Sequence, residues 1–413
     1  MSASQFDVAV IGAGPSGAVA SALLNKRGFK VCVLEKQHFP RFVIGESLLP
    51  HCMEMLEEAG FADAVRAEPS FQFKNGAAFS WGSRYTEFNF TDKFSDGPGT
   101  VYQVRRGIFD KILIDEAAKQ GVEVRFGHGV TAFDNSGDLA RLSVEADTGE
   151  SYELTAKFVL DASGYGRVLP RLLDLETPSH LPPRQAHFTH IDDNITNPKF
   201  DRSKILITTH PQHRDVWIWL IPFGDNRCSI GVVGTPDVLA GESETVLKKF
   251  VYECPMLKEI LDKAVWENDF PFRSIQGYSA NVKSLHGKHF ALLGNAAEFL
   301  DPVFSSGVTI ALHSAKLAAD LLAKQLEGGA ADWDAEFAKP LMIGVNAFRT
   351  YVDGWYDFRF QNAIYAPNRS PEISRMISSI LAGYAWDTAN PFVAKSEQRL
   401  SALAALVGDV KVE

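Results

Sequence analysis

Residues 6–17 read FDVAVIGAGPSG, and this stretch decides the fold. Its apolar, β-branched first half ends in glycines, which is typical of a buried parallel strand. The segment 18–25, AVASALLN, has the composition of a helix, and 30–36, KVCVLEK, reads as a second buried strand. Strand, glycine-rich turn, helix and strand therefore follow one another as a complete βαβ unit.

The glycines of this turn have the spacing of a dinucleotide site. Gly12 permits the tight turn, Gly14 lets the backbone approach a pyrophosphate, and Gly17 lets the helix pack on the strand. The N-terminus of the helix offers free N–H groups to the phosphates. Glu35 ends the second strand, where it can accept hydrogen bonds from a ribose diol. A purely structural turn is the alternative, and the complete context disfavours it.

Composition bounds the class of protein. The chain has 413 residues, of which 46% are hydrophobic, enough for a large core and for two to three domains. Its net charge of -10 argues against a nucleic-acid partner. No apolar run reaches the roughly 20 residues of a membrane span, and no signal peptide is read, so we expect a cytoplasmic protein. The cysteines show no CxxC spacing, and we expect no metal site: Cys32, Cys52, Cys228 and Cys254.

The rest of the chain predicts an interleaved α/β architecture. A helix at 109–121 precedes the strand VEVRFG, and the strands ARLSVEA and SYELTAKFVLDASG form an antiparallel meander that leads back to the nucleotide domain. The strands KILITT, DVWIWLIPF and CSIGVVG then indicate an antiparallel sheet. We therefore expect a Rossmann-type domain over 1–175 and 281–335, an antiparallel-sheet substrate domain over 176–280, and a helical C-terminal region over 336–413.

Two further motifs resemble the FAD-dependent monooxygenase superfamily. GNAAEFLDPVFSSG at 294–307 resembles its GDAA…P…G segment, which implies that Asn295, Pro302 and Gly307 meet the ribityl chain and isoalloxazine of FAD. Asn295 replaces the usual aspartate, but an amide can also hydrogen-bond the ribityl hydroxyls. VYQVRRGIFD at 101–110 matches the family's QVxRxxFD stretch.

This second motif implies further FAD contacts. Arg106 would bind the FAD phosphates, with Arg105 as the alternative, and Gln103 would lie beside the cofactor. The resemblance also places three other side chains at the cofactor: Ser16, Lys36 and Arg41. No second glycine-rich βαβ unit is present for NAD(P)H. Electrons are therefore expected to arrive as FADH2 from a separate flavin reductase, or from a nicotinamide that binds transiently.

The hexapeptide WIWLIP at 217–222 resembles the WxWxIP signature of the flavin-dependent halogenases, although Val216 replaces the usual preceding glycine. On a strand, Trp217 and Trp219 share one face and would form a rigid apolar wall beside the flavin. Ordinary packing of aromatic residues in a sheet is the alternative. The resemblance implies that FADH2 and oxygen form a flavin hydroperoxide, that a halide attacks it, and that the hypohalous acid travels to a lysine.

Lys74 lies where the family carries that lysine, between GESLLP at 45–50 and WIWLIP. It is the only charge between Pro69 and Ser83. Its segment contains four aromatic residues that would give it an apolar setting: Phe71, Phe73, Phe79 and Trp81. Desolvation lowers the pKa of a lysine and favours the free amine that a haloamine route needs. The alternative is a surface lysine at a strand edge.

Ser305, Ser306 and Gly307 are read as the turn before a helix, and this turn predicts an anion site. Backbone N–H groups at a helix start attract anions, and the resemblance assigns the halide, chloride or bromide, to the amides of Ser306 and Gly307. A serine N-cap is the plain structural alternative.

The residue at position 304, a phenylalanine, narrows the class of expected aromatic substrates. Tryptophan halogenases carry a glutamate at this position, whereas the shorter relatives that act on phenols and pyrroles lack it. The expected reaction is therefore halogenation of a small electron-rich aromatic, free or carrier-tethered, with Phe304 beside it. The alternatives are a monooxygenase, dehydrogenase or reductase of the same fold, or a flavin-binding protein that no longer catalyses. A helical stripe of aromatic residues in the tail is expected to pack on the sheet, with a wall of the substrate site as the alternative: Phe348, Tyr351, Trp355 and Phe358.

Overall fold

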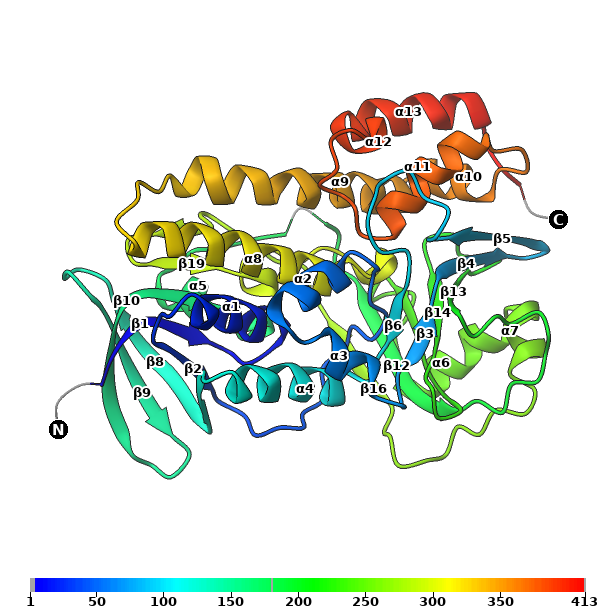
Figure 1. Cartoon of the computed structure of the whole chain (residues 1–413). Coiled ribbons are helices and arrows are strands. Elements are labelled where there is room, and N and C mark those ends of the chain that lie inside the picture. Colours follow the sequence, from blue (N-terminus) through cyan, green and yellow to red (C-terminus); the bar gives the residue numbers. More distant parts are fainter. Residues whose placement is uncertain (1–3, 180, 412–413) are drawn as a thin grey trace.

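The computed structural model describes residues 4–179 and 181–411 and contains two large sheets with a helical layer above them (Figure 1). The first sheet has its parallel strands at the centre and consists of β1 (Ser4–Ile11), β2 (Val31–Glu35), β7 (Glu123–Phe126), β8 (His128–Asp134), β9 (Ala140–Ala146), β10 (Ser151–Asp161), β18 (His286–Gly287) and β19 (Phe290–Leu292). Its main order is β18-β19-β10-β1-β2-β7. Strand β9 also pairs with β10, and β8 pairs with β9. The predicted nucleotide-binding sheet and its antiparallel meander are both confirmed.

Helices from distant parts of the chain cover this sheet. These are α1 (Pro15–Lys26), α4 (Arg106–Lys119) and α8 (Ser306–Leu326), with the shorter α2 (Cys52–Ala59), α3 (Ala62–Arg66) and α5 (Val168–Leu172) around them. Helix α1 packs against α4, α2 and α8, so the segment after residue 290 returns to the nucleotide-binding turn. Helix α4 begins three residues before the expected start at Phe109.

The second sheet has the order β16-β12-β15-β14-β13-β4-β5. Its strands are β4 (Gly76–Trp81), β5 (Arg84–Asn89), β12 (Gln185–Asp192), β13 (Lys204–Thr209), β14 (Trp217–Pro222), β15 (Arg227–Gly234) and β16 (Arg273–Gln276). All neighbours are antiparallel except β13 and β4, which are parallel. Strands β4 and β5 come from the stretch expected to serve the nucleotide domain, so the interleaving starts earlier than expected.

The two faces of the second sheet are buried against different partners. One face packs on α6 (Ser243–Tyr252) and α7 (Pro255–Ile260) through residues such as Ile218 and Leu220 of β14. The opposite face carries Trp217, Trp219 and Ile221 into the core shared with the first sheet and the tail. The period of two along β14 therefore places both tryptophans on the face toward the nucleotide-binding half.

Helices form the tail, at the top of Figure 1: α9 (Lys339–Tyr356), α10 (Arg359–Tyr365), α11 (Pro371–Leu381), α12 (Pro391–Ala394) and α13 (Ser396–Val407). The expected aromatic stripe is confirmed for Phe348, Tyr351 and Trp355, which are fully buried on α9. It is wrong for Phe358, because α9 ends at Tyr356 and Phe358 adopts a left-handed conformation (φ 73°) before α10.

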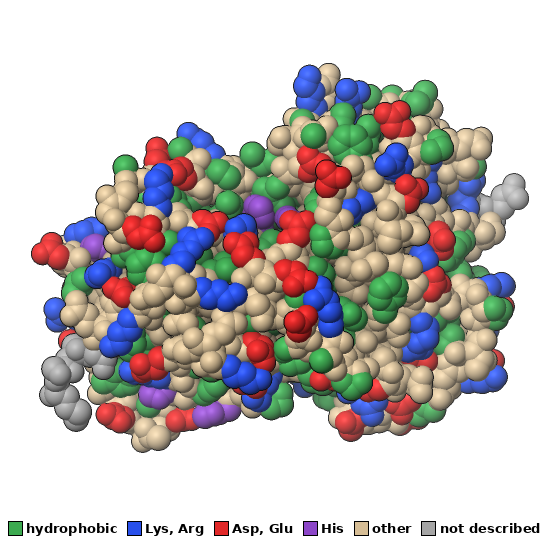
Figure 2. Space-filling model, in the orientation of Figure 1, with side chains coloured by type: hydrophobic (Ala, Val, Ile, Leu, Met, Phe, Trp, Pro, Cys, Tyr) green, Lys and Arg blue, Asp and Glu red, His purple; other side chains and the backbone are tan. Residues whose placement is uncertain are grey.

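Short elements complete the chain: β3 (Gln72–Lys74) paired with β6 (Val101–Gln103), β11 (Glu176–Thr177) paired with β17 (Asn281–Val282), and the single turns η1 (Gly164–Gly166), η2 (Gly294–Ala296), η3 (Pro302–Phe304) and η4 (Asp334–Ala338). Within the described ranges, no helix is long and apolar enough to cross a bilayer. Acidic and basic side chains are interspersed on the face seen in Figure 2.

Candidate active site

The glycine-rich turn has the geometry that its spacing predicts. A Cβ at Gly12 (φ +97°) would lie 2.6 Å from the Ala162 carbonyl oxygen, and a Cβ at Gly17 would lie 2.0 Å from the Gly12 oxygen. Both contacts are too short for any side chain, so the turn requires glycine there. At Gly14 an added Cβ would come within 4 Å of a single group, the Arg41 guanidinium at 3.6 Å. The outer side of the turn is therefore open to a ligand.

Glu35 is held beside this turn by backbone donors. Its two carboxylate oxygens accept hydrogen bonds from the N–H groups of Ala13 (2.9 Å) and Gln37 (3.0 Å). The side chain is buried at the end of β2, where a ribose would lie next to a phosphate on α1. Lys36, the next residue, is exposed.

Two arginines meet at one aspartate near the turn. Arg106 donates from Nε and Nη2 to the two oxygens of Asp110 at 2.8 and 3.1 Å, and Arg41 donates to Asp110 at 3.2 Å. Arg41 also lies 3.9 Å from Glu35. The alternative, Arg105, instead pairs with Asp225 in the turn between β14 and β15. Asp110 was not predicted, although its i,i+4 spacing from Arg106 in a helix was the available signal.

Buried polar atoms without partners indicate that a polar group fits here. Among the described residues, neither side-chain atom of Gln103 has a hydrogen-bond partner, although the residue is fully buried. The Oε2 atom of Glu46 also lacks a hydrogen-bond partner among the described residues, while its Oε1 lies 2.7 Å from Nε2 of His190. Buried polar atoms without partners lower the stability of a folded protein. Gln103 forms an isolated backbone bridge with Ser47, and Arg106 donates to the Gly45 carbonyl, so both residues with unpaired atoms belong to segments that meet beside Arg106, where a polar group such as FAD would fit.

The segment that leads into α8 brings three expected cofactor residues close together: Ser16, Asn295 and Gly307. A Cβ at Gly307 would lie 3.9 Å from the Asn295 amide oxygen, and one at Gly294 would lie 3.6 Å from the Ser16 hydroxyl. The segment 294–307 therefore links the first turn of α1 to that of α8. Pro302 begins η3 in the same segment.

The N-terminus of α8 lacks the side-chain cap that a serine could supply. Ser305 occupies the N-cap in a left-handed conformation (φ 57°), and its hydroxyl caps nothing among the described residues. The expected Ser306 and Gly307 occupy the first two helical positions. Their amides are those that an anion can reach at a helix start.

Lys74 is completely buried, so the alternative of a surface lysine is wrong. Its Nζ donates to the Ser47 hydroxyl and to the Leu48 carbonyl, each at 2.7 Å, and lies 5.5 Å from the centre of the Phe90 ring. Burial without a carboxylate partner lowers the pKa of Lys74 to about 7. The uncharged amine therefore makes up about half of the population at neutral pH.

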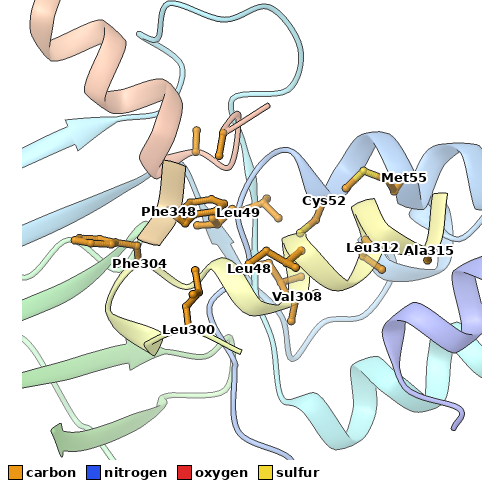
Figure 3. Packing of buried hydrophobic residues seen from close by; sticks show 14 of the residues in the cluster. Leu48, Leu49, Cys52, Met55, Leu300, Phe304, Val308, Leu312, Ala315 and Phe348 are labelled. Atoms are coloured by element: carbon orange, nitrogen blue, oxygen red, sulfur yellow. The ribbon is translucent and has the colours of Figure 1, made fainter. Parts of the chain in front are cut away.

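The expected apolar setting of Lys74 is wrong for one of its four aromatic residues, Phe73. Phe73 points outward and is 45% exposed, because neighbouring strand residues face opposite sides. The segment that contains Leu48, whose carbonyl accepts from Lys74, packs on α8. Figure 3 shows Leu48 beside Val308 of α8, and Leu49 beside Phe348.

The two tryptophans lie side by side, with ring centroids 5.9 Å apart. The Trp219 indole donates to the Ser229 hydroxyl at 3.0 Å, and the Trp217 indole donates to the Tyr356 hydroxyl at 3.0 Å. Both rings are nearly fully buried and fixed by these bonds. Their expected role as a wall beside the flavin stays a prediction.

Phe304 lies in an aromatic cluster. Its ring meets those of Trp355 and Phe360 edge-on, at 5.7 and 5.2 Å. The side chain is buried and points away from α8 (Figure 3). No carboxylate occupies this position. In residues 4–179 and 181–411, no group of His, Cys, Asp and Glu side chains could hold a metal ion.

Comparisons with known proteins identify the family of the chain. Residues 5–336 match the FAD binding domain family. A crystal structure of a flavoprotein/dehydrogenase from Cytophaga hutchinsonii is 44% identical and covers 98% of both chains with a TM-score of 0.93. A 1H-pyrrole-2-carbonyl-[peptidyl-carrier protein] chlorinase of Pseudomonas fluorescens is 29% identical over 385 residues, 87% of this chain and 83% of the relative.

A tryptophan 2-halogenase of Chondromyces crocatus is 31% identical over 333 residues, 76% of this chain and 60% of the relative. The family match covers well over half of the chain and includes the turn, Glu35, Gln103, Arg106 and the start of α8. The expected cofactor, FAD, and the expected fold are thereby confirmed. The chain belongs to the FAD binding domain family, and it is a flavin-dependent oxidoreductase related to the flavin-dependent halogenases.

Proposed function

We propose that this protein is a halogenase that uses FADH2, oxygen and a halide to halogenate an electron-rich phenol or pyrrole. Bound FAD supplies the oxidising chemistry, and a separate reductase supplies its electrons. The carrier-tethered pyrrole of the Pseudomonas fluorescens relative supports a small aromatic, free or on a carrier protein, as the substrate.

The observation that carries the proposal is the environment of Lys74. A neutral amine has two N–H donors and one lone pair. Ser47 and Leu48 accept from Lys74 at 2.7 Å each, so in the neutral form both N–H groups are used and the lone pair remains free. The lowered pKa makes this form available at neutral pH. Such an amine can hold hypohalous acid by a hydrogen bond or as a haloamine.

Other residues of the chain would carry and confine the reactants. The amides of Ser306 and Gly307 hold the halide at the positive end of α8. Trp217 and Trp219 form an immobile apolar surface that keeps water and substrate from the cofactor. Lys74 then orients the halogenating agent toward the aromatic carbon.

Turnover tests the proposal directly. The protein is incubated with a generic flavin reductase, bromide and a panel of phenols and pyrroles, and the products are read by mass spectrometry. Brominated products are expected. Hydroxylated products, or bleaching of bound flavin by NAD(P)H alone, would instead support a monooxygenase or dehydrogenase.

Free tryptophan should be a poorer substrate than simple phenols. A carboxylate at the Phe304 position would help remove the proton from a less activated ring, and phenylalanine cannot. A ring hydroxyl or pyrrole nitrogen already stabilises the cation, so we expect phenol turnover to exceed tryptophan turnover by roughly tenfold or more. Initial rates under identical FADH2 supply measure the ratio. Faster turnover of tryptophan would contradict the argument from Phe304.

The yield of halogenated product per hypobromous acid formed should rise with pH through about 7, the pKa of Lys74. Below this pH the ammonium form has no lone pair, and above it the free amine predominates. Product and trapped hypobromous acid are measured together from pH 6 to 8.5. Lys74→Arg, which stays protonated, serves as the control and should give a low yield throughout. A flat profile for the wild type would argue against the free amine.

A further inference from the structure

A buried carboxyl group in the turn before α8 has no place in the function proposed so far. Asp301 precedes η3, and its Oδ1 accepts from the Val303 N–H at 3.0 Å. Its Oδ2 accepts from the Tyr356 hydroxyl at 2.8 Å, and the Tyr356 oxygen accepts from the Trp217 indole at 3.0 Å. Asp301 is thus fixed by a backbone N–H of its own turn and by Tyr356 of α9, which is in turn held by Trp217 of β14.

Among residues 4–179 and 181–411, the charged group that acts on this carboxyl is Arg184. The Arg184 guanidinium, which precedes β12, stacks over the Tyr356 ring at 3.7 Å and acts on Asp301 through space. Its Nη1 lies 3.5 Å from Asp215, a half-exposed carboxylate. The other titratable groups nearby are the hydroxyls of Tyr356, Tyr278 and Tyr165, whose pKa values burial raises. These phenols stay neutral at physiological pH.

Two polar atoms in this cluster lack partners among the described residues, Arg184 Nε and the Tyr278 hydroxyl. Both side chains are more than nine-tenths buried. The cluster is therefore polar but not saturated, unlike a purely structural ion pair.

The carboxyl group of Asp301 changes its protonation state close to physiological pH. Burial raises the pKa of Asp301 to about 6, although Tyr356, the Val303 N–H and Arg184 all favour the ionised form. Asp301 lies five residues before Ser306 in one continuous turn. An ionised carboxylate there repels an anion at the α8 amides, because the interior screens charge weakly.

Halogenation consumes a proton together with each halide. The balanced reaction joins reduced FAD, oxygen, one halide ion, one proton and an aromatic C–H, and yields FAD, the aryl halide and two water molecules. Two electrons from reduced FAD and two from the C–H bond reduce oxygen to water. A group that takes up this proton as the halide enters would keep the charge of the buried site constant.

We propose that Asp301 is this group, so that halide binding at the Ser306 and Gly307 amides is coupled to protonation of Asp301. Tyr356, itself held by Trp217, is a positioning residue that sets the orientation of the carboxyl. The inference rests on the proposed function, because it takes the α8 amides as the halide site.

Halide binding to the protein loaded with oxidised FAD tests the coupling without turnover. Line broadening of ³⁵Cl⁻ in NMR, reversed by bromide, gives the bromide affinity from pH 5 to 8. If only the protonated form binds, affinity falls roughly tenfold for each pH unit above the pKa, so binding at pH 8 should be about 10- to 100-fold weaker than at pH 5. Calorimetry in buffers of different ionisation enthalpy should show uptake of a proton with bromide at pH 7.

Asp301→Asn is the matched variant, because an amide keeps an oxygen to accept from Tyr356 but holds no titrating proton. Bromide binding should become independent of pH in this variant. Asp215→Asn, which removes the other carboxyl beside Arg184, should keep the wild-type dependence. Tyr356→Phe removes a hydrogen bond that favours the carboxylate form of Asp301, so the midpoint of the pH dependence of bromide binding should move to higher pH. This variant also tests the coupling if Asp301→Asn fails to fold.

The outcomes separate the two proposals. Bromide binding that does not vary with pH in the wild type, or that varies equally in Asp301→Asn, overturns the coupling and leaves the halide site intact. Absence of bromide binding at every pH overturns the halide site and the coupling together.

Discussion

Lys74→Ala should lower the rate of aromatic halogenation by roughly 100-fold or more while leaving FAD oxidation and hypohalous acid formation unchanged. The variant removes the amine that we propose holds the halogenating agent, which is bonded to Ser47 and Leu48. The steps at the flavin use other residues and should continue. Product by mass spectrometry and hypobromous acid by a chemical trap are measured in the same reaction.

A matched control separates chemistry from folding. Lys74→Met keeps the length and packing of the side chain but has no amine, and it should lose product in the same way. It should also be more stable than the wild type, because desolvation of the Lys74 amine costs on the order of 5 kcal/mol at pH 7, given the pKa of about 7. This cost is largest below pH 7 and disappears as pH approaches 10.5, the ordinary value for lysine. Unchanged product yield in either variant would refute a role for the amine.

Glu35→Arg should weaken FAD binding by roughly 100-fold. The substitution removes the acceptor expected for the ribose hydroxyls and breaks the bonds from the Ala13 and Gln37 N–H groups. It also places a second guanidinium beside Arg41, which lies 3.9 Å from the native carboxylate. Quenching of flavin fluorescence during titration measures the affinity.

Glu145→Arg makes the same change of charge at an exposed position of β9 in the same sheet, and its FAD affinity should equal that of the wild type. Thermal unfolding without FAD shows whether either variant is misfolded. Equal affinities for both variants would mean that Glu35 does not contact the cofactor.

The sequence correctly predicts those features of the fold and the site that depend on short motifs and on the periodicity of single elements. The spacing of Gly12, Gly14, Gly17 and Glu35 is enough to place the nucleotide-binding turn, because the glycines lie within one turn and the parallel pairing of β2 with β1 brings Glu35 beside it. The isolation of Lys74 among uncharged residues correctly predicts its lowered pKa. The period of two in WIWLIP correctly predicts that both tryptophans share a face.

The remainder depends on contacts that no local pattern encodes. Ser47 and Leu48 approach Lys74 across 27 and 26 residues of sequence. Tyr356 reaches Trp217 across 139 residues, and Asp301 across 55. Asp301 belongs to the motif at 294–307, but its buried setting includes Tyr356 of α9, which is distant in the sequence.

The parallel pairing of β4 with β13 has a consequence for recombining this enzyme with its relatives. Strand β13 is buried along its whole length, and residues 76–81 cover its edge from more than 120 positions upstream. A chimaera that exchanges residues 176–280 as a cassette would replace one side of this seam and keep the other. Mismatched side chains would then expose a long apolar strand edge, which invites pairing with other chains. Segments that can be shuffled between relatives must therefore carry β4 and β5 with them.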